Sequence, residues 1–302
     1  MVSRIGLGCA SYWAKPGFSE KQARAVLETA LNCGITLFDT GASYSAGHAE
    51  LRLGRLLREL QAEPDGLLIG TKVGTVSDSR GRLKKDFRPE SITRQLEQSL
   101  QRLELDRIGL LQLHGPEPSD LSDELLKALE QFKTQGKVEL LGINAHQHSI
   151  RTCIGREPFD VLMPFISLLE LDHDQLAEQA EQTGQGVLAA GPLARMLFAP
   201  PLQQWLRQPS GWWYLARALR HPSLIPWQRI RALRSILKHT DWSAAQLALA
   251  WVLEQPGVSC AVFGTTRPVH ILELAAASQR ELPADIRNAV ARLIATDRIE
   301  TS

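Results

Sequence analysis

The stretch Thr36-Leu-Phe-Asp-Thr-Gly-Ala-Ser-Tyr44 joins a short β-prone run, which ends on an acid, to a polar loop that ends on a tyrosine. Two later strand-like runs also end on a reactive side chain. Leu67-Leu-Ile-Gly-Thr-Lys72 ends on a lysine, and Ile108-Gly-Leu-Leu-Gln-Leu-His114 ends on a histidine. The sequence therefore predicts an acid, a lysine and a histidine at the carboxyl ends of three consecutive strands, with a phenol in the first loop.

The rest of the chain alternates between short β-like runs and amphipathic helical stretches, which is typical of a parallel sheet wound with helices. We predict eight strands, at residues 4–10, 36–40, 67–73, 108–115, 138–145, 161–167, 186–192 and 258–265. Helices are predicted at residues 19–32, 48–61, 89–103, 121–135, 146–153, 172–183, 243–254, 268–278 and 283–294.

Eight β/α units without a break in composition favour the α/β class and a single-domain (β/α)8 TIM barrel over residues 1–302. A doubly wound open sheet is the alternative. The segment Gly6-Leu-Gly-Cys-Ala10 lacks the third glycine of a dinucleotide-binding fingerprint and does not open a helix directly, so it gives that alternative little support.

Residues 198–242 interrupt the alternation of predicted strands and helices, between the seventh strand and the helix predicted at 243–254. This stretch combines several tryptophans with many arginines. One interpretation is a helical insertion whose aromatic side chains pack while its arginines face water. Another is a lid over the barrel mouth, which would offer aromatic surface and positive charge to a substrate or a cofactor phosphate.

Composition points to a small-molecule partner. The 34 basic and 33 acidic residues balance, which favours neither nucleic acid nor an anionic membrane surface. Neither a run of about 18 apolar residues nor a signal peptide is visible. The four widely spaced cysteines form no CxxC pair, so we expect reduced thiols, a cytoplasmic location and no metal site. The sequence leaves the oligomeric state open.

The four reactive side chains suit proton transfer to an oxygen. In a closed barrel the carboxyl ends of all strands open onto one face, where Asp39, Lys72 and His114 meet if each points inward. A phenol has a pKa near 10 in water, and a neighbouring ammonium lowers it. Asp39 would keep Lys72 charged, and His114 would orient a carbonyl oxygen. Because no residue supplies a hydride, the set implies a nicotinamide cofactor.

At this point the chain resembles the aldo-keto reductase family. The matching motifs are Phe38-Asp-Thr40 with Tyr44, Ala49-Glu50 followed by Leu53-Gly54, Thr71-Lys72, Leu113-His114, Gly191-Pro-Leu193, Ala245-Gln-Leu-Ala-Leu-Ala-Trp251 and Gly264-Thr-Thr-Arg-Pro268. The resemblance implies Tyr44 as general acid/base, Asp39 and Lys72 as its tuning pair, and His114 as carbonyl orienter. It also implies NAD(P)H across the barrel mouth and a substrate pocket that includes Tyr12 and Trp13.

The resemblance implies a set of cofactor-binding residues: Asn144, Met163, Gly191, Pro192, Leu193, Gly264, Thr265, Thr266 and Arg267. Some positions depart from the family pattern: Asn144 is followed by Ala145 and acts alone, Met163 replaces a glutamine, Ala190 an aromatic, and Leu274 an asparagine. These departures weaken the expected grip on the nicotinamide and the adenine. The guanidinium of Arg267 favours NADP, with NAD possible.

Three functions remain open. The first is an NAD(P)H-dependent oxidoreductase that interconverts a carbonyl (aldehyde, ketone or sugar-like) and an alcohol. The second is a cofactor-independent acid/base enzyme, such as a dehydratase or isomerase, on the same scaffold, which the departures at Ala145, Met163 and Ala190 would suit. The third is a non-catalytic subunit that senses the cofactor. The complete set of Asp39, Tyr44, Lys72 and His114 favours the first.

Overall fold

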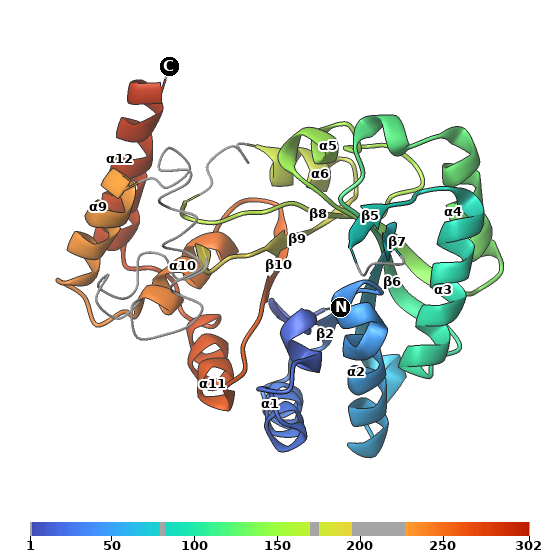
Figure 1. Ribbon diagram of the computed structural model, residues 1–302. Helices are drawn as coiled ribbons and strands as arrows, with labels where there is room; N and C mark the ends of the chain where they lie inside the picture. The colour runs from blue at the N-terminus through green and yellow to red at the C-terminus, as the bar shows by residue number, and fades with distance from the viewer. Residues whose placement is uncertain (1, 79–81, 170–174, 195–226, 302) are drawn as a thin grey trace.

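The computed structural model describes residues 2–78, 82–169, 175–194 and 227–301, and Figure 1 shows their arrangement. Eight parallel strands close into a barrel in the order β1-β10-β9-β8-β7-β6-β3-β2. They are β1 (Ile5–Gly8), β2 (Leu37–Asp39), β3 (Leu68–Val73), β6 (Ile108–His114), β7 (Val138–Asn144), β8 (Val161–Met163), β9 (Gly186–Ala190) and β10 (Val258–Phe263). The predicted (β/α)8 TIM barrel is therefore confirmed, and all eight predicted strands are present.

Helices surround this barrel. They are α1 (Glu20–Asn32), α2 (His48–Glu59), α3 (Pro89–Leu103), α4 (Asp123–Thr134), α5 (Gln147–Arg151), α6 (Leu176–Gln182), α9 (Trp227–Leu237), α10 (Ala244–Leu253), α11 (Pro268–Ala277) and α12 (Ala284–Thr301). In Figure 1, α9 and α12 stand side by side at the left of the molecule. Ser19 and Ser243 each form a capping box with the glutamine three residues later, and these boxes fix the starts of α1 and α10.

Two differences from the predicted elements lie at the carboxyl end of the barrel, and α12 also extends to Thr301, seven residues beyond the predicted end at 294. Strand β8 ends at Met163, four residues early, because Pro164 has no backbone N–H to continue the ladder. A two-stranded hairpin, β4 (Thr75–Ser77) and β5 (Leu83–Lys85), follows β3 where we predicted only a loop.

The barrel interior determines where the reactive residues meet. Eight buried apolar side chains fill it: Leu37, Leu110, Val161, Met163, Leu188, Ala190, Cys260 and Val262. Along each strand alternate side chains point inward, so residues two positions after an interior residue face the barrel mouth. The strand register pairs Asp39 with Gly70, Lys72 with Gln112, and His114 with Asn144. These side chains therefore gather at the carboxyl end of the barrel.

The predicted insertion, residues 198–242, lies largely outside the described residues, since only 227–242 are described. That part consists of α9 and the turn that leads to α10. Trp242 is buried, and the Arg280 guanidinium carbon lies 4.2 Å from the centre of its ring. Ile230, Leu233 and Trp242 belong to the buried apolar core, and the insertion over residues 198–242 stays a prediction.

Candidate active site

A buried ion pair occupies the mouth of the barrel. Asp39 and Lys72 are 5% and 2% exposed, and the Lys72 ammonium donates to Asp39 Oδ2 and, at 2.8 Å, to the Thr40 carbonyl. Burial alone would lower the pKa of Lys72. The Asp39 carboxylate and the Tyr44 phenol together outweigh burial, so the pKa of the ammonium lies above its ordinary value. Lys72 therefore carries a positive charge near neutral pH.

Tyr44 lies above this pair, in the loop after β2. The Lys72 nitrogen lies 5.2 Å from the centre of the Tyr44 ring. The loop is held to β3 by the Ala42 amide, which donates to the Lys72 carbonyl at 3.0 Å. Ser45 and Ala46 have φ angles of 49° and 54°, an arrangement that costs non-glycine residues about 1 kcal/mol or more each. The backbone thus accepts strain directly after the tyrosine.

His114 completes the group from the end of β6. Its ring meets the Tyr44 ring edge to face, with centroids 5.7 Å apart. Burial, Lys72 and Lys85 lower the pKa of His114 to about 3, so the imidazole is neutral near pH 7. Nδ1 is buried without a hydrogen-bond partner among the described residues. A proton on Nε2 avoids an unpaired N–H at Nδ1, and it makes His114 a neutral hydrogen-bond donor.

This neutral histidine predicts acid sensitivity. An unfolded histidine takes up a proton below about pH 6.5, whereas His114 in the folded protein stays neutral until about pH 3. The unfolded state then binds more protons, so stability falls as the pH drops through that range. Between pH 6.5 and 5 we expect His114 to account for a loss of about 2 kcal/mol.

Urea unfolding at pH 7 and pH 5 checks this expectation. His114→Gln should reduce the loss of unfolding free energy between the two pH values by roughly 2 kcal/mol. His148→Gln makes the same chemical change at an exposed position on α5 and should leave the loss unchanged. An equal pH dependence in the wild type and His114→Gln would contradict the buried neutral histidine.

Sequence reasoning missed two residues of this group. Gln112, two positions before His114, donates its amide N–H to Asp39 Oδ1 at 2.9 Å. Lys85, from the unpredicted hairpin, donates to the His114 carbonyl and to Thr75 Oγ1. The alternation of side chains put Gln112 on the same strand face as His114, but its partner lies 73 residues away in sequence. No sequence pattern placed Lys85 near His114, because the hairpin that carries Lys85 was not predicted.

The predicted nicotinamide side lies next to this group. Asn144, at the end of β7, donates from Nδ2 to the Met163 carbonyl at 2.9 Å, and both side chains are buried. Ala190 pairs with Phe165, whose ring lies near Gly191. Ala190 has no aromatic side chain, but the Phe165 ring lies close to this position. Pro192 and Leu193 follow Gly191 directly. Pro192 is buried and Leu193 is half-buried.

The loop from Gly264 to Arg267 connects β10 to α11. Thr265 is buried, while Thr266 and Arg267 are exposed. The Thr265 hydroxyl accepts the Arg267 amide N–H at 3.1 Å and contacts His270 Nδ1 at 2.9 Å. Burial and the neighbouring Arg267 lower the pKa of His270. Within the described residues Arg267 has no carboxylate partner, so its guanidinium is available to an anion.

Three other positions named by the family resemblance have different surroundings. The Tyr12 hydroxyl donates to the Gly8 carbonyl at 2.6 Å and lies beside Gly264, at the junction of β1 and β10. Trp13 is fully buried and packs edge to face on Phe18, so it lies in the core and not at an open pocket surface. Leu274 is also buried in the core.

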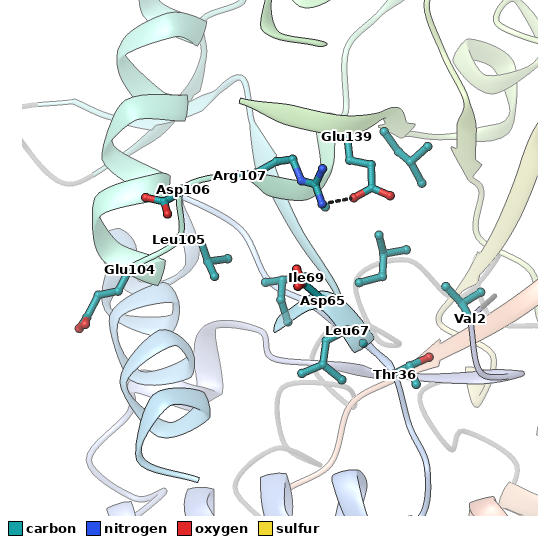
Figure 2. Close-up of a pocket in the computed structure, with 14 residues that line it drawn as sticks. Val2, Thr36, Asp65, Leu67, Ile69, Glu104, Leu105, Asp106, Arg107 and Glu139 are labelled. Atoms are coloured by element: carbon teal, nitrogen blue, oxygen red, sulfur yellow. Dashed lines mark ion pairs between the residues drawn. The ribbon is translucent and has the colours of Figure 1, made fainter. Parts of the chain in front are cut away.

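A separate hollow of about 750 Å³ lies at the opposite, amino-terminal end of the barrel. Figure 2 shows its lining, from the starts of β3, β6 and β7, with the ion pair between Arg107 and Glu139 at 3.2 Å. Because it is remote from Asp39 and Lys72, it is not the site of the proton-transfer group. In the described parts of the chain, no three His, Cys, Asp or Glu side chains gather to hold a metal ion. Nor does any described helix have the length and apolar composition to cross a bilayer.

Comparison with known proteins agrees with this geometry. The family model described as the aldo/keto reductase family matches residues 4–295. The aldo-keto reductase YhdN of Bacillus subtilis is 26% identical over 282 residues, which cover 88% of this chain and 82% of that protein. The NADH-specific methylglyoxal reductase of Escherichia coli is 27% identical over 303 residues, which cover 91% of this chain and 90% of that protein.

The fold gives the same result. An aldo-keto reductase from Bacillus halodurans, solved in its holo form, matches with a TM-score of 0.79 and 26% identity, over 97% of this chain and 92% of that one. The family model spans nearly the whole chain, and the barrel is the one that this relative has. The chain therefore belongs to the aldo/keto reductase family, a family of oxidoreductases that use nicotinamide cofactors.

Proposed function

We propose that this protein is an NAD(P)H-dependent oxidoreductase that interconverts a small carbonyl compound and its alcohol, with Tyr44 as general acid/base. The observation that carries the proposal is the buried Lys72–Asp39 pair beneath the Tyr44 ring. A fixed ammonium beside a phenol stabilises the phenolate that remains after the phenol gives its proton away. An ion pair with a purely structural role would not need a phenol beside it.

Each residue has a distinct role in this proposal. Tyr44 gives its proton to the carbonyl oxygen as negative charge develops there, and takes a proton back in the reverse direction. Lys72 stabilises the phenolate, and Asp39 keeps Lys72 in place. His114, neutral and protonated on Nε2, donates a hydrogen bond that orients the carbonyl oxygen. The nicotinamide, when bound, supplies or accepts the hydride.

The residues around the mouth fit such a cofactor. Because Nδ2 of Asn144 already donates to Met163, its Oδ1 is the atom that can receive the N–H of a carboxamide. The backbone of Gly191, Pro192 and Leu193 would run along the pyrophosphate, and Gly264 to Arg267 would hold the far phosphate. We propose NADPH as the preferred form because the Arg267 guanidinium has no carboxylate partner among the described residues and can bind a 2′-phosphate. NADH is the alternative, since one relative is NADH-specific.

Three further proposals concern the domain organisation, Tyr12 and the location of the protein. We treat residues 1–302 as one domain, with 198–242 as an insertion within it. Tyr12, which lies beside Gly264, would line the mouth on the β1 side. We also propose a cytoplasmic location, for which the four free thiols are the support.

A titration with NADPH and then NADH, followed by quenching of tryptophan fluorescence, tests the proposal first. We expect binding in the micromolar range, followed by oxidation of NADPH when a panel of aldehydes, ketones and sugars is supplied. Tight binding without turnover of any carbonyl would favour a cofactor-sensing subunit. Undetectable binding of both cofactors at millimolar concentration would mean that the departures at Ala145, Met163 and Ala190 prevent cofactor binding, and a cofactor-independent reaction would take the place of this proposal.

The preference for NADPH should depend on Arg267. Arg267→Ala removes charge-assisted hydrogen bonds to a 2′-phosphate, which are worth roughly 1.5 to 3 kcal/mol, so the Kd for NADPH should rise about ten- to a hundredfold. The Kd for NADH should change little. Arg58→Ala, at an exposed arginine on α2, is the matched control. An equal loss for both cofactors would show that Arg267 does not contact a 2′-phosphate.

A further inference from the structure

Gln112 lies in the barrel interior, in contact with the ion pair. Its side chain is 0% exposed, and Nε2 donates to Asp39 Oδ1 at 2.9 Å. The other carboxylate oxygen, Oδ2, accepts a hydrogen bond from the Lys72 ammonium. A carboxylate can only accept hydrogen bonds, so the amide must turn its nitrogen toward Asp39. Asp39 is therefore held from both sides, by an amide on one oxygen and an ammonium on the other.

The barrel makes room for this amide. Gly142 of β7 lies opposite Gln112 in the strand register. A Cβ atom at Gly142 would stand 3.2 Å from Gln112 Cγ and 2.9 Å from the Val161 carbonyl oxygen, so a larger residue would push on the Gln112 stem. Because Gly142 has no side chain, there is room for the Gln112 side chain that reaches Asp39.

The other end of the amide has no comparable partner. Gln112 Oε1 is buried without a hydrogen-bond partner among the residues that the structure describes. A buried acceptor without a partner is unfavourable, and an apolar side chain of similar size would avoid it. The bond from Nε2 to Asp39 is therefore the interaction that accounts for an amide at this position.

We propose that Gln112 is a positioning residue: it fixes the Asp39 carboxylate so that Oδ2 faces Lys72, and through Lys72 it sets how readily Tyr44 exchanges its proton. This inference rests on the proposed function of Tyr44. Without the amide, Asp39 can rotate about its Cα–Cβ and Cβ–Cγ bonds, and its charge is no longer shared with an N–H. Both changes weaken the effect of the Lys72 charge at the phenol.

Two variants test the proposal through the pH dependence of kcat. Gln112→Met removes the donor and should lower kcat about tenfold, with KM unchanged. Gln112→Glu keeps the shape of the side chain. The new carboxyl can donate a hydrogen bond to Asp39 when it is protonated, whereas its ionised form repels the Asp39 carboxylate. Relative to the wild type, this variant should be most active near pH 5 and lose about tenfold or more by pH 8. A role in packing alone predicts that Gln112→Met, which has a similar volume, keeps the wild-type kcat.

A second measurement needs no substrate. The chain has three tyrosines, Tyr12, Tyr44 and Tyr214, so a ¹³C label on the phenol carbon gives three NMR signals, and Tyr44→Phe assigns one of them. In Gln112→Met, Tyr44 should form its phenolate at a higher pH than in the wild type, because the Lys72 charge acts less strongly on the phenol. Gln185→Met is the control, because Gln185 is also buried and, among the described residues, its side chain bonds to Cys153, Phe159, Gly155 and Thr183 but not to Asp39, Lys72 or Tyr44.

The two measurements separate the two proposals. Unchanged phenolate formation in Gln112→Met, together with a flat relative pH profile in Gln112→Glu, would overturn the role of Gln112. A wild type that turns over no carbonyl would overturn the proposed function, and the NMR titration would still decide whether Gln112 acts on Tyr44 through Asp39 and Lys72.

Discussion

Tyr44→Phe is expected to lower kcat for carbonyl reduction by about 10²- to 10⁴-fold, because it removes the hydroxyl that we propose as the proton donor to the substrate oxygen. The ring itself remains, so its edge-to-face contact with His114 and its position over Lys72 should persist. Steady-state oxidation of NADPH with the best substrate of the carbonyl panel measures the loss.

The cofactor titration is the control for this variant. The Kd for NADPH should stay within about twofold of the wild type, since in the proposed mechanism the hydroxyl acts on the reacting oxygen and not on the cofactor phosphates. A loss in kcat and kcat/KM by the same factor is the signature of a group that acts in the transition state. Full turnover by Tyr44→Phe would exclude Tyr44 as the general acid/base and, with it, the mechanism proposed above.

Sequence reasoning found the barrel because its signals are local. A capping serine at Ser19 or Ser243, and a strand that ends on a chemically distinctive residue, can each be recognised within a few residues. Once eight such units are counted, closure of the barrel brings Asp39, Lys72 and His114 to one end without further information.

The parts that sequence reasoning missed depend on distant contacts. The strands of the β4–β5 hairpin have three residues each and contain few apolar side chains, so no alternation marks them. Trp13 stands in a loop that was expected to open onto the mouth, and only its packing on Phe18 places it in the core. Gln112 had no predicted role, because its bond to Asp39 joins residues 73 positions apart in the sequence. Local patterns predict elements, while side-chain partners come from closure of the barrel.

Lys72→Met should lower the free energy of unfolding as well as kcat. The variant leaves the Asp39 carboxylate buried with Gln112 as its only side-chain donor among the described residues, and breaking a buried pair in this way costs roughly 3 to 5 kcal/mol. Denaturant unfolding at pH 7 measures the cost. Lys133→Met is the matched control: it breaks the partly exposed pair with Asp160 and should cost less than about 1 kcal/mol.

The double variant Asp39→Asn/Lys72→Met separates stability from catalysis. Removing both charges leaves no unpaired ion in the barrel, so most of the lost unfolding free energy should return. Turnover should not return, because no ammonium remains beside Tyr44 to stabilise the phenolate. If the double variant recovered activity along with stability, Lys72 would be a structural residue. Recovery of stability alone would show that the barrel can fold without this charge pair and that proton transfer at Tyr44 cannot occur without it.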